Sequence, residues 1–117
     1  MHGGANILRS EECIRSLQHR GVLIRVIHEC DTLQILRTDI DPGSTVDNIE
    51  LADSPAYHLV LDGNPVFHAS NRSDDLMPGD SIVFSDDRPY TVSNSAPSRS
   101  VILTVLFRDP QKKDARP

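Results

Sequence analysis

The sequence lacks the side chains that most readily fill a large core. It contains no tryptophan, and its aromatic residues are two tyrosines and three phenylalanines. The core must therefore be built mainly from isoleucine, leucine and valine. No run of eighteen consecutive apolar residues occurs, which argues against a membrane-spanning helix. Because 17 acidic side chains outnumber 12 basic ones, we expect no nucleic-acid partner. The lack of a long apolar run predicts no membrane partner.

Cysteine is also scarce. Cys13 and Cys30 are the two cysteines, and they lie too far apart to form the C-x-x-C spacing of a redox or metal site. We expect them to be reduced thiols of a cytoplasmic protein. Residues 1–6 have neither the basic start nor the apolar stretch that is typical of a signal peptide, which agrees with that localisation.

Turn-forming residues, in contrast, are frequent. Eight prolines and six glycines divide the 117 residues into short segments that are rich in β-branched and apolar side chains. Evenly spaced short strands favour a sandwich or a closed barrel. The sequence therefore predicts one all-β domain over residues 22–107, with an N-terminal segment at 1–21 and a polar tail at 108–117. Its predicted strands are 22–28, 32–39, 45–51, 56–61, 66–69, 81–84, 90–93 and 100–107.

A helical pattern occurs once, near the N-terminus. Ser10 is a favourable N-cap, and the two glutamates after it suit the first turn of a helix. The amphipathic run 13–17 follows, and Gly21 is a typical C-terminal stop. We therefore predict a short N-terminal helix before the first strand.

Turn chemistry also predicts how some strands are joined. Asp62-Gly63 is a favoured two-residue hairpin turn, which predicts direct pairing of the strands on either side of it. In that register Phe67 lies opposite His58. The polar pair Asp74-Asp75 indicates a further turn, ahead of Met77.

Two glycine-containing frames resemble the paired motifs of the cupin superfamily. Gly43 and Gly63 occupy the two glycine positions of the first motif, and Pro78-Gly79-Asp80 with Asn94 matches the frame of the second. The resemblance covers residues 33–107. It implies a cupin-type double-stranded β-barrel, which is similar to a jelly roll.

The same resemblance implies that the usual metal ligands are missing. The family's His-x-His pair falls in the stretch Ile49-Glu50-Leu51-Ala52, its glutamate falls on Ala56, and its last histidine falls on Tyr90. A divalent metal requires three or four convergent nitrogen or oxygen donors. We therefore expect no metal and no cofactor, and the family's metal-dependent chemistry is not carried over.

Strand alternation places several side chains inside the predicted barrel. If position 56 points inward, His58 and Val60 do so as well, and Tyr90 and Val92 face the same space. An imidazole and a phenol in one apolar cavity could bind a polar ligand group or act as acid and base. The alternative is that they bond to each other inside a filled barrel.

Two charged residues complete the candidate ligand site. Glu50 lies close to the missing histidine pair, and a shift of one residue in register would turn it inward. Arg88 follows two aspartates in a loop at the predicted barrel mouth, where it could meet an anionic ligand. A solvent-exposed surface position is the simpler explanation for both residues.

Three functions remain open. The first is a metal-free module that binds or senses a small molecule in the barrel. The second is a metal-independent isomerase, epimerase, lyase or cyclase that uses Tyr90 and His58. The third is a structural dimerisation domain. Whichever function holds, Tyr57, Leu59 and Leu61 form an outward apolar row that predicts a homodimer.

Overall fold

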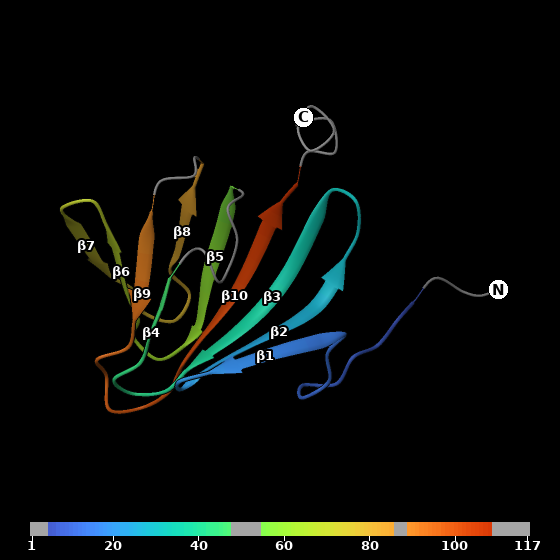
Figure 1. The fold of residues 1–117 in the computed structure, drawn as a ribbon, viewed down its shortest axis with the longest axis horizontal. Coiled ribbons are helices and arrows are strands. Elements are labelled where there is room, and N and C mark those ends of the chain that lie inside the picture. Colours follow the sequence, from blue (N-terminus) through green and yellow to red (C-terminus); the bar gives the residue numbers. More distant parts are fainter. Residues whose placement is uncertain (1–4, 48–54, 86–88, 109–117) are drawn as a thin grey trace.

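The computed structural model describes residues 5–47, 55–85 and 89–108, which form ten strands in two antiparallel sheets (Figure 1). The all-β prediction is confirmed. Within these ranges no helix occurs that is long and apolar enough to cross a membrane. The strands are β1 (Arg15–His19), β2 (Val22–Glu29), β3 (Leu33–Ile40), β4 (Thr45–Asp47), β5 (Ala56–Asp62), β6 (Val66–Ala69), β7 (Arg72–Asp75), β8 (Ser81–Phe84), β9 (Tyr90–Ser93) and β10 (Ser100–Phe107).

The larger sheet has the strand order β1-β2-β3-β10-β5-β8, and the smaller sheet has the order β4-β9-β6-β7. Figure 1 shows the larger sheet curving across the molecule, with the smaller sheet gathered on one side of it. Alternate residues of both sheets point into the space between them. The core there is mainly aliphatic and includes Val22, Ile24, Leu36, Ile40, Val46, Val92, Ile102 and Leu106.

The predicted N-terminal helix is wrong. Residues 15–19 form the edge strand β1 and pair with β2. Arg20 and Gly21 join the two strands with φ angles of 49° and 82°, the left-handed pair that a two-residue hairpin turn requires. The residues around the predicted N-cap, Ser10, instead form a β-turn, in which the Glu12 amide donates to the Arg9 carbonyl at 2.9 Å. Pairing with an apolar neighbouring strand outweighs the weak helical propensity of this segment.

The predicted hairpin at Asp62-Gly63 is also wrong. Strand β5 belongs to the larger sheet and β6 to the smaller one, so this turn carries the chain from one sheet to the other. Gly63 has a φ of 85°, and a Cβ atom added there would lie 2.5 Å from the Cα atom of Ser100. The glycine is therefore required by its conformation and by close backbone approach.

The pair Asp74-Asp75 lies in strand β7 and is not the predicted turn. This strand pairs with β6 and forms the edge of the smaller sheet. Its sequence, Arg-Ser-Asp-Asp, has no apolar residue that would indicate a strand. Charged side chains are common on edge strands because they discourage pairing with other chains.

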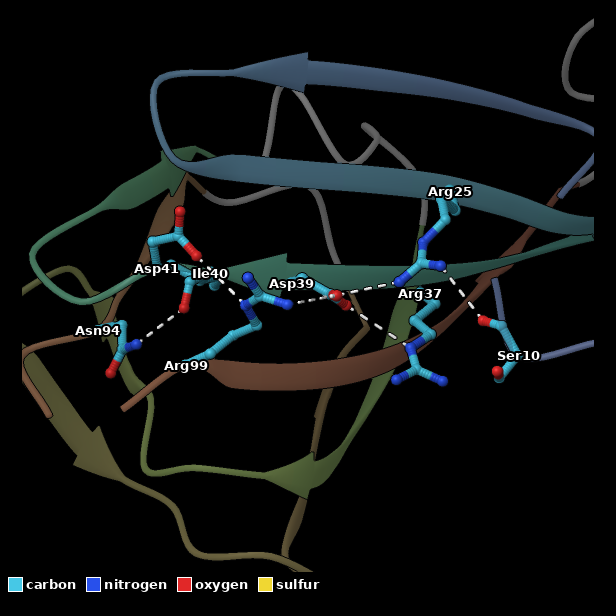
Figure 2. Close-up of polar contacts among 8 residues, drawn as sticks. All are labelled: Ser10, Arg25, Arg37, Asp39, Ile40, Asp41, Asn94 and Arg99. Atoms are coloured by element: carbon cyan, nitrogen blue, oxygen red, sulfur yellow. Dashed lines mark hydrogen bonds and ion pairs between the residues drawn. The ribbon is translucent and has the colours of Figure 1, made fainter. Parts of the chain in front are cut away.

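Asn94, which ends the second glycine-containing frame, has a structural role. Its side-chain amide donates to the carbonyl of Ile40 at 2.8 Å (Figure 2). The same amide also donates to the carbonyl of Ser98 at 2.9 Å. Its side-chain oxygen accepts from the Ala96 amide at 3.1 Å. The residue thereby ties the loop after β9 to the end of β3.

Candidate functional site

Three polar side chains meet inside the barrel: His58 on β5, Thr104 on β10 and Tyr90 on β9. His58 and Thr104 are cross-strand neighbours in the larger sheet, and Tyr90 reaches them from the smaller sheet. His58 Nδ1 lies 2.8 Å from Thr104 Oγ1, and His58 Nε2 lies 2.8 Å from the Tyr90 hydroxyl. The exposed fractions are 0% for His58 and Thr104 and 5% for Tyr90. The inward orientation predicted from strand alternation is therefore confirmed.

Aromatic rings fill the space around this hydrogen-bonded group. Phe67 and Phe84 pack on the imidazole of His58, with ring centroids at 5.2 Å and 6.0 Å. Phe84 and Tyr90 are stacked nearly parallel, at 3.9 Å and 6°. Phe67 thus faces His58 across the interior and not as a hairpin neighbour. Side chains occupy the centre of the barrel.

Burial favours the uncharged form of both titratable groups. Desolvation lowers the pKa of His58 to about 4, and desolvation raises the pKa of Tyr90 above its usual value. The phenol is a stronger donor than an alcohol, so we assign the tautomer in which Tyr90 donates to Nε2 and Nδ1–H donates to Thr104. This arrangement satisfies both ring nitrogens without a ligand.

The remaining predicted site residues separate into two groups. Val60 and Val92 are buried on the inward faces of β5 and β9, as alternation predicted. Glu50 and Arg88 lie outside the described residues, as do Ile49 and Leu51. A role in ligand contact stays a prediction for Val60, Val92, Glu50 and Arg88.

The described residues at the family's metal position do not fit a divalent metal ion. Ala56 supplies only a methyl group, and the nearest donors, His58 and Tyr90, bond to each other. Across residues 5–47, 55–85 and 89–108, no group of three histidine, cysteine, aspartate or glutamate side chains could hold a metal. His68 points away from His58 and bonds Ser73 Oγ at 2.7 Å and Ser93 Oγ at 2.9 Å.

A cleft lies between β7 and β8, which are edge strands of the two facing sheets. Its volume is about 440 Å³. Phe67 and Phe84, the rings that pack on His58, form part of its wall. The other lining residues are Ala69, Ser70, Asn71, Arg72, Asp74, Ile82, Val83 and Ser85.

Sequence reasoning missed this cleft because it did not recognise β7 as a strand. The inward alternation of Phe67 and Ala69 on β6, and of Ile82 and Phe84 on β8, was readable from the sequence. The sequence did not indicate that these two pairs belong to different sheets, or that the edges of those sheets face each other.

No protein-family model and no curated protein matches the sequence. Solved structures do match the fold. A cupin superfamily protein from Desulfitobacterium hafniense has a TM-score of 0.65 at 21% identity, over 80% of this chain and 84% of its own. The cupin domain of an XRE family transcriptional regulator from Enterobacter cloacae has a TM-score of 0.67 at 13% identity, over 78% and 99%. The polyketide cyclase RemF from Streptomyces resistomycificus has a TM-score of 0.70 at 12% identity, over 90% and 80%.

These similarities, together with two facing antiparallel sheets in the order given above, show that the chain has the cupin fold.

Proposed function

We propose that the chain is a binding module that takes up a small molecule in the cleft between β7 and β8. The cleft volume of about 440 Å³ carries this proposal, because pockets for small ligands typically measure about 300–1,000 Å³. The barrel centre is a poorer location, since the group formed by His58, Tyr90 and Thr104 leaves no ring nitrogen unpaired.

The lining residues favour a ligand with an apolar or aromatic body and a polar end. Phe67, Phe84 and Ile82 offer an apolar wall on which such a body would pack. Arg72 lies at the rim, where its Nε is 2.9 Å from Asp74 Oδ2 and its side chain is largely exposed. A carboxylate, sulfonate or phosphate on the ligand would pair with this arginine in place of, or beside, Asp74.

A catalytic function has weaker support. Two of the similar structures illustrate the alternatives, since one is a domain of a transcriptional regulator and another is a polyketide cyclase. Acid–base catalysis by Tyr90 and His58 would require a substrate to reach groups that are buried behind Phe84 and bonded to each other. Binding in the cleft requires no such rearrangement.

The test uses the dye 1-anilinonaphthalene-8-sulfonate, which combines an aromatic body with one sulfonate. We expect saturable fluorescence enhancement with the wild-type protein. The variant Ala69→Phe fills the cleft and should abolish it, because Ala69 faces the cleft from β6. The matched control is His68→Phe, the same substitution one residue earlier on the opposite face of the same strand, which should keep the enhancement.

A second control separates the cleft from other apolar surface. Leu103 lies on the outer face of the larger sheet, so Leu103→Lys should leave dye binding in the cleft intact. Loss of the enhancement in Leu103→Lys together with its retention in Ala69→Phe would overturn the proposal, because it would place the dye on the outer face.

A further inference from the structure

Three arginines surround one aspartate on the outer face of the larger sheet. Arg25, Arg37 and Asp39 alternate along β2 and β3 with core residues, so they point away from the smaller sheet. Arg25 Nη2 lies 3.0 Å from Asp39 Oδ2, and Arg37 Nε lies 3.5 Å from Asp39 Oδ1. Arg99, directly before β10, brings Nη1 to 3.8 Å from Asp39 Oδ2. Figure 2 shows the three guanidinium groups reaching Asp39 from different directions.

The pairing register places two of these positive charges side by side. Arg25 and Arg37 are direct partners across β2 and β3. Like charges directly opposite each other destabilise a sheet, so the two arginines need anions nearby. Asp39 is a carboxylate that meets both of them.

Burial divides the cluster into a base and a rim. Arg25 and Asp39 form the base, since they are 8% and 6% exposed. The base is held further by the Ser10 carbonyl, which accepts from Arg25 Nη1 at 3.2 Å (Figure 2). The side chains of Arg37 and Arg99 form the rim, with exposed fractions of 33% and 60%. Two guanidinium groups that contact the same buried carboxylate are thus open to solvent.

The cluster has more donors than acceptors within the described residues. Asp41 pairs with Arg99 at 3.2 Å, which gives three positive and two negative charges in total. Each guanidinium carries five N–H donors. Arg25 Nε is buried and has no hydrogen-bond partner in the described part of the chain, and Arg37 Nε lies farther from Asp39 than an ordinary hydrogen bond allows. A buried charged donor without an acceptor is costly, so the cluster calls for a further anion.

We propose that this arginine cluster binds a phosphate group, held at the rim by Arg37 and Arg99. The inference is independent of ligand binding in the cleft. Guanidinium groups bind phosphate through paired N–H donors. A tetrahedral phosphate accepts hydrogen bonds from several directions, which suits guanidinium groups that approach from different sides, whereas a carboxylate is planar. Inorganic phosphate and the phosphate monoester of a small molecule share this chemistry.

The experiment follows the arginine Nε–H signals by nuclear magnetic resonance during a titration with inorganic phosphate at constant ionic strength. We expect saturable shifts for Arg37 and Arg99. The Nε–H signal of Arg72, which pairs with Asp74 on β7, should stay in place. A parallel titration with glycerol 3-phosphate distinguishes the two sources, because tighter binding than that of inorganic phosphate indicates a monoester and equal or weaker binding indicates the free ion. Tighter binding of acetate than of either would overturn the assignment to phosphate.

Two variants of the exposed ion pair change the affinity in opposite directions. Arg99→Gln removes a rim donor and should raise the dissociation constant for phosphate about tenfold. Asp41→Asn removes the carboxylate that competes for Arg99 and should lower this constant several-fold. Both side chains are at least half exposed, so both variants should keep the wild-type circular dichroism.

The matched controls are Arg72→Gln and Asp74→Asn. They make the same substitutions in another arginine–aspartate pair, with Nε 2.9 Å from Oδ2, and should leave the dissociation constant for phosphate unchanged. The absence of saturable shifts at Arg37 and Arg99 would overturn the proposal. So would a loss of affinity in Arg72→Gln with none in Arg99→Gln, because it would place the phosphate in the cleft.

Discussion

The buried histidine makes stability depend on pH in a specific window. His58 has a pKa of about 4 in the folded protein because of desolvation, against an ordinary value of 6.5. Between these values the unfolded chain binds a proton that the folded chain does not, so stability falls as the pH is lowered. Above pH 6.5 neither state is protonated there, and the stability is fully present.

The size of the effect follows from the same two values. The complete shift corresponds to about 3 kcal/mol, of which about 2 kcal/mol should already be lost at pH 5. For a domain of this length, that loss corresponds to a decrease in melting temperature of roughly 6–10 °C. The guanidinium of Arg15 lowers the pKa of Glu29 to about 2, so the contribution of Glu29 is fully present above its ordinary value of 4.5 and begins to be lost only at the lower end of this window.

The assay is thermal unfolding, followed by circular dichroism, of the wild-type protein and of His58→Gln between pH 7.5 and 4.5. Glutamine retains a donor and an acceptor but does not titrate. The difference between the two pH profiles therefore isolates His58. If the two profiles run parallel through this range, the imidazole is not desolvated as described, and its place in a closed, filled barrel is refuted.

Three further substitutions test individual contacts by urea unfolding. Tyr90→Phe leaves a buried ring nitrogen without its partner and should cost about 1–3 kcal/mol, and an unchanged stability would mean that the hydroxyl bonds elsewhere. Gly63→Ala should greatly reduce the folded yield, because the added carbon would lie 2.5 Å from backbone. Gly43→Ala is the control: Gly43 has a similar positive φ but open space around it, so this variant should cost about 1 kcal/mol. Equal effects of the two variants would contradict the crowding at Gly63. Asp39→Ala leaves a buried arginine unpaired and should cost about 3–5 kcal/mol, far more than Asp41→Ala, whose carboxylate is half exposed.

Much of the fold was predictable because strand alternation and turn residues act locally. The inward position of His58 required only that β5 be a strand with Ala56 facing the core. The inward positions of Val60 and Val92 followed from the same alternation along β5 and β9. Such predictions depend on neighbouring residues in the chain, and the structure confirms them.

The errors arose where distant segments decide the outcome. Residues 15–19 form a strand because β2 is available to pair with them. The Asp62-Gly63 turn joins two sheets because Ser100 packs against Gly63, and the two residues are far apart in the sequence. Neither partner can be identified from the local pattern.

The cleft is the clearest example. Its wall combines Phe67 of the smaller sheet with Phe84 of the larger one, so it exists only once both sheets are assembled. The polar sequence of β7, which borders it, gave no strand signal. A candidate ligand site at the junction of two sheet edges could therefore be identified only from the structure.

Methyl nuclear magnetic resonance during a titration with 1-anilinonaphthalene-8-sulfonate tests the location of the ligand site most directly. Ile82 lines the cleft, whereas Ile102 is buried between the sheets on β10. The dye should shift the Ile82 methyl signals in a saturable way and leave those of Ile102 in place. Saturable shifts at Ile102 without shifts at Ile82 would place the ligand in the barrel centre and contradict a filled interior.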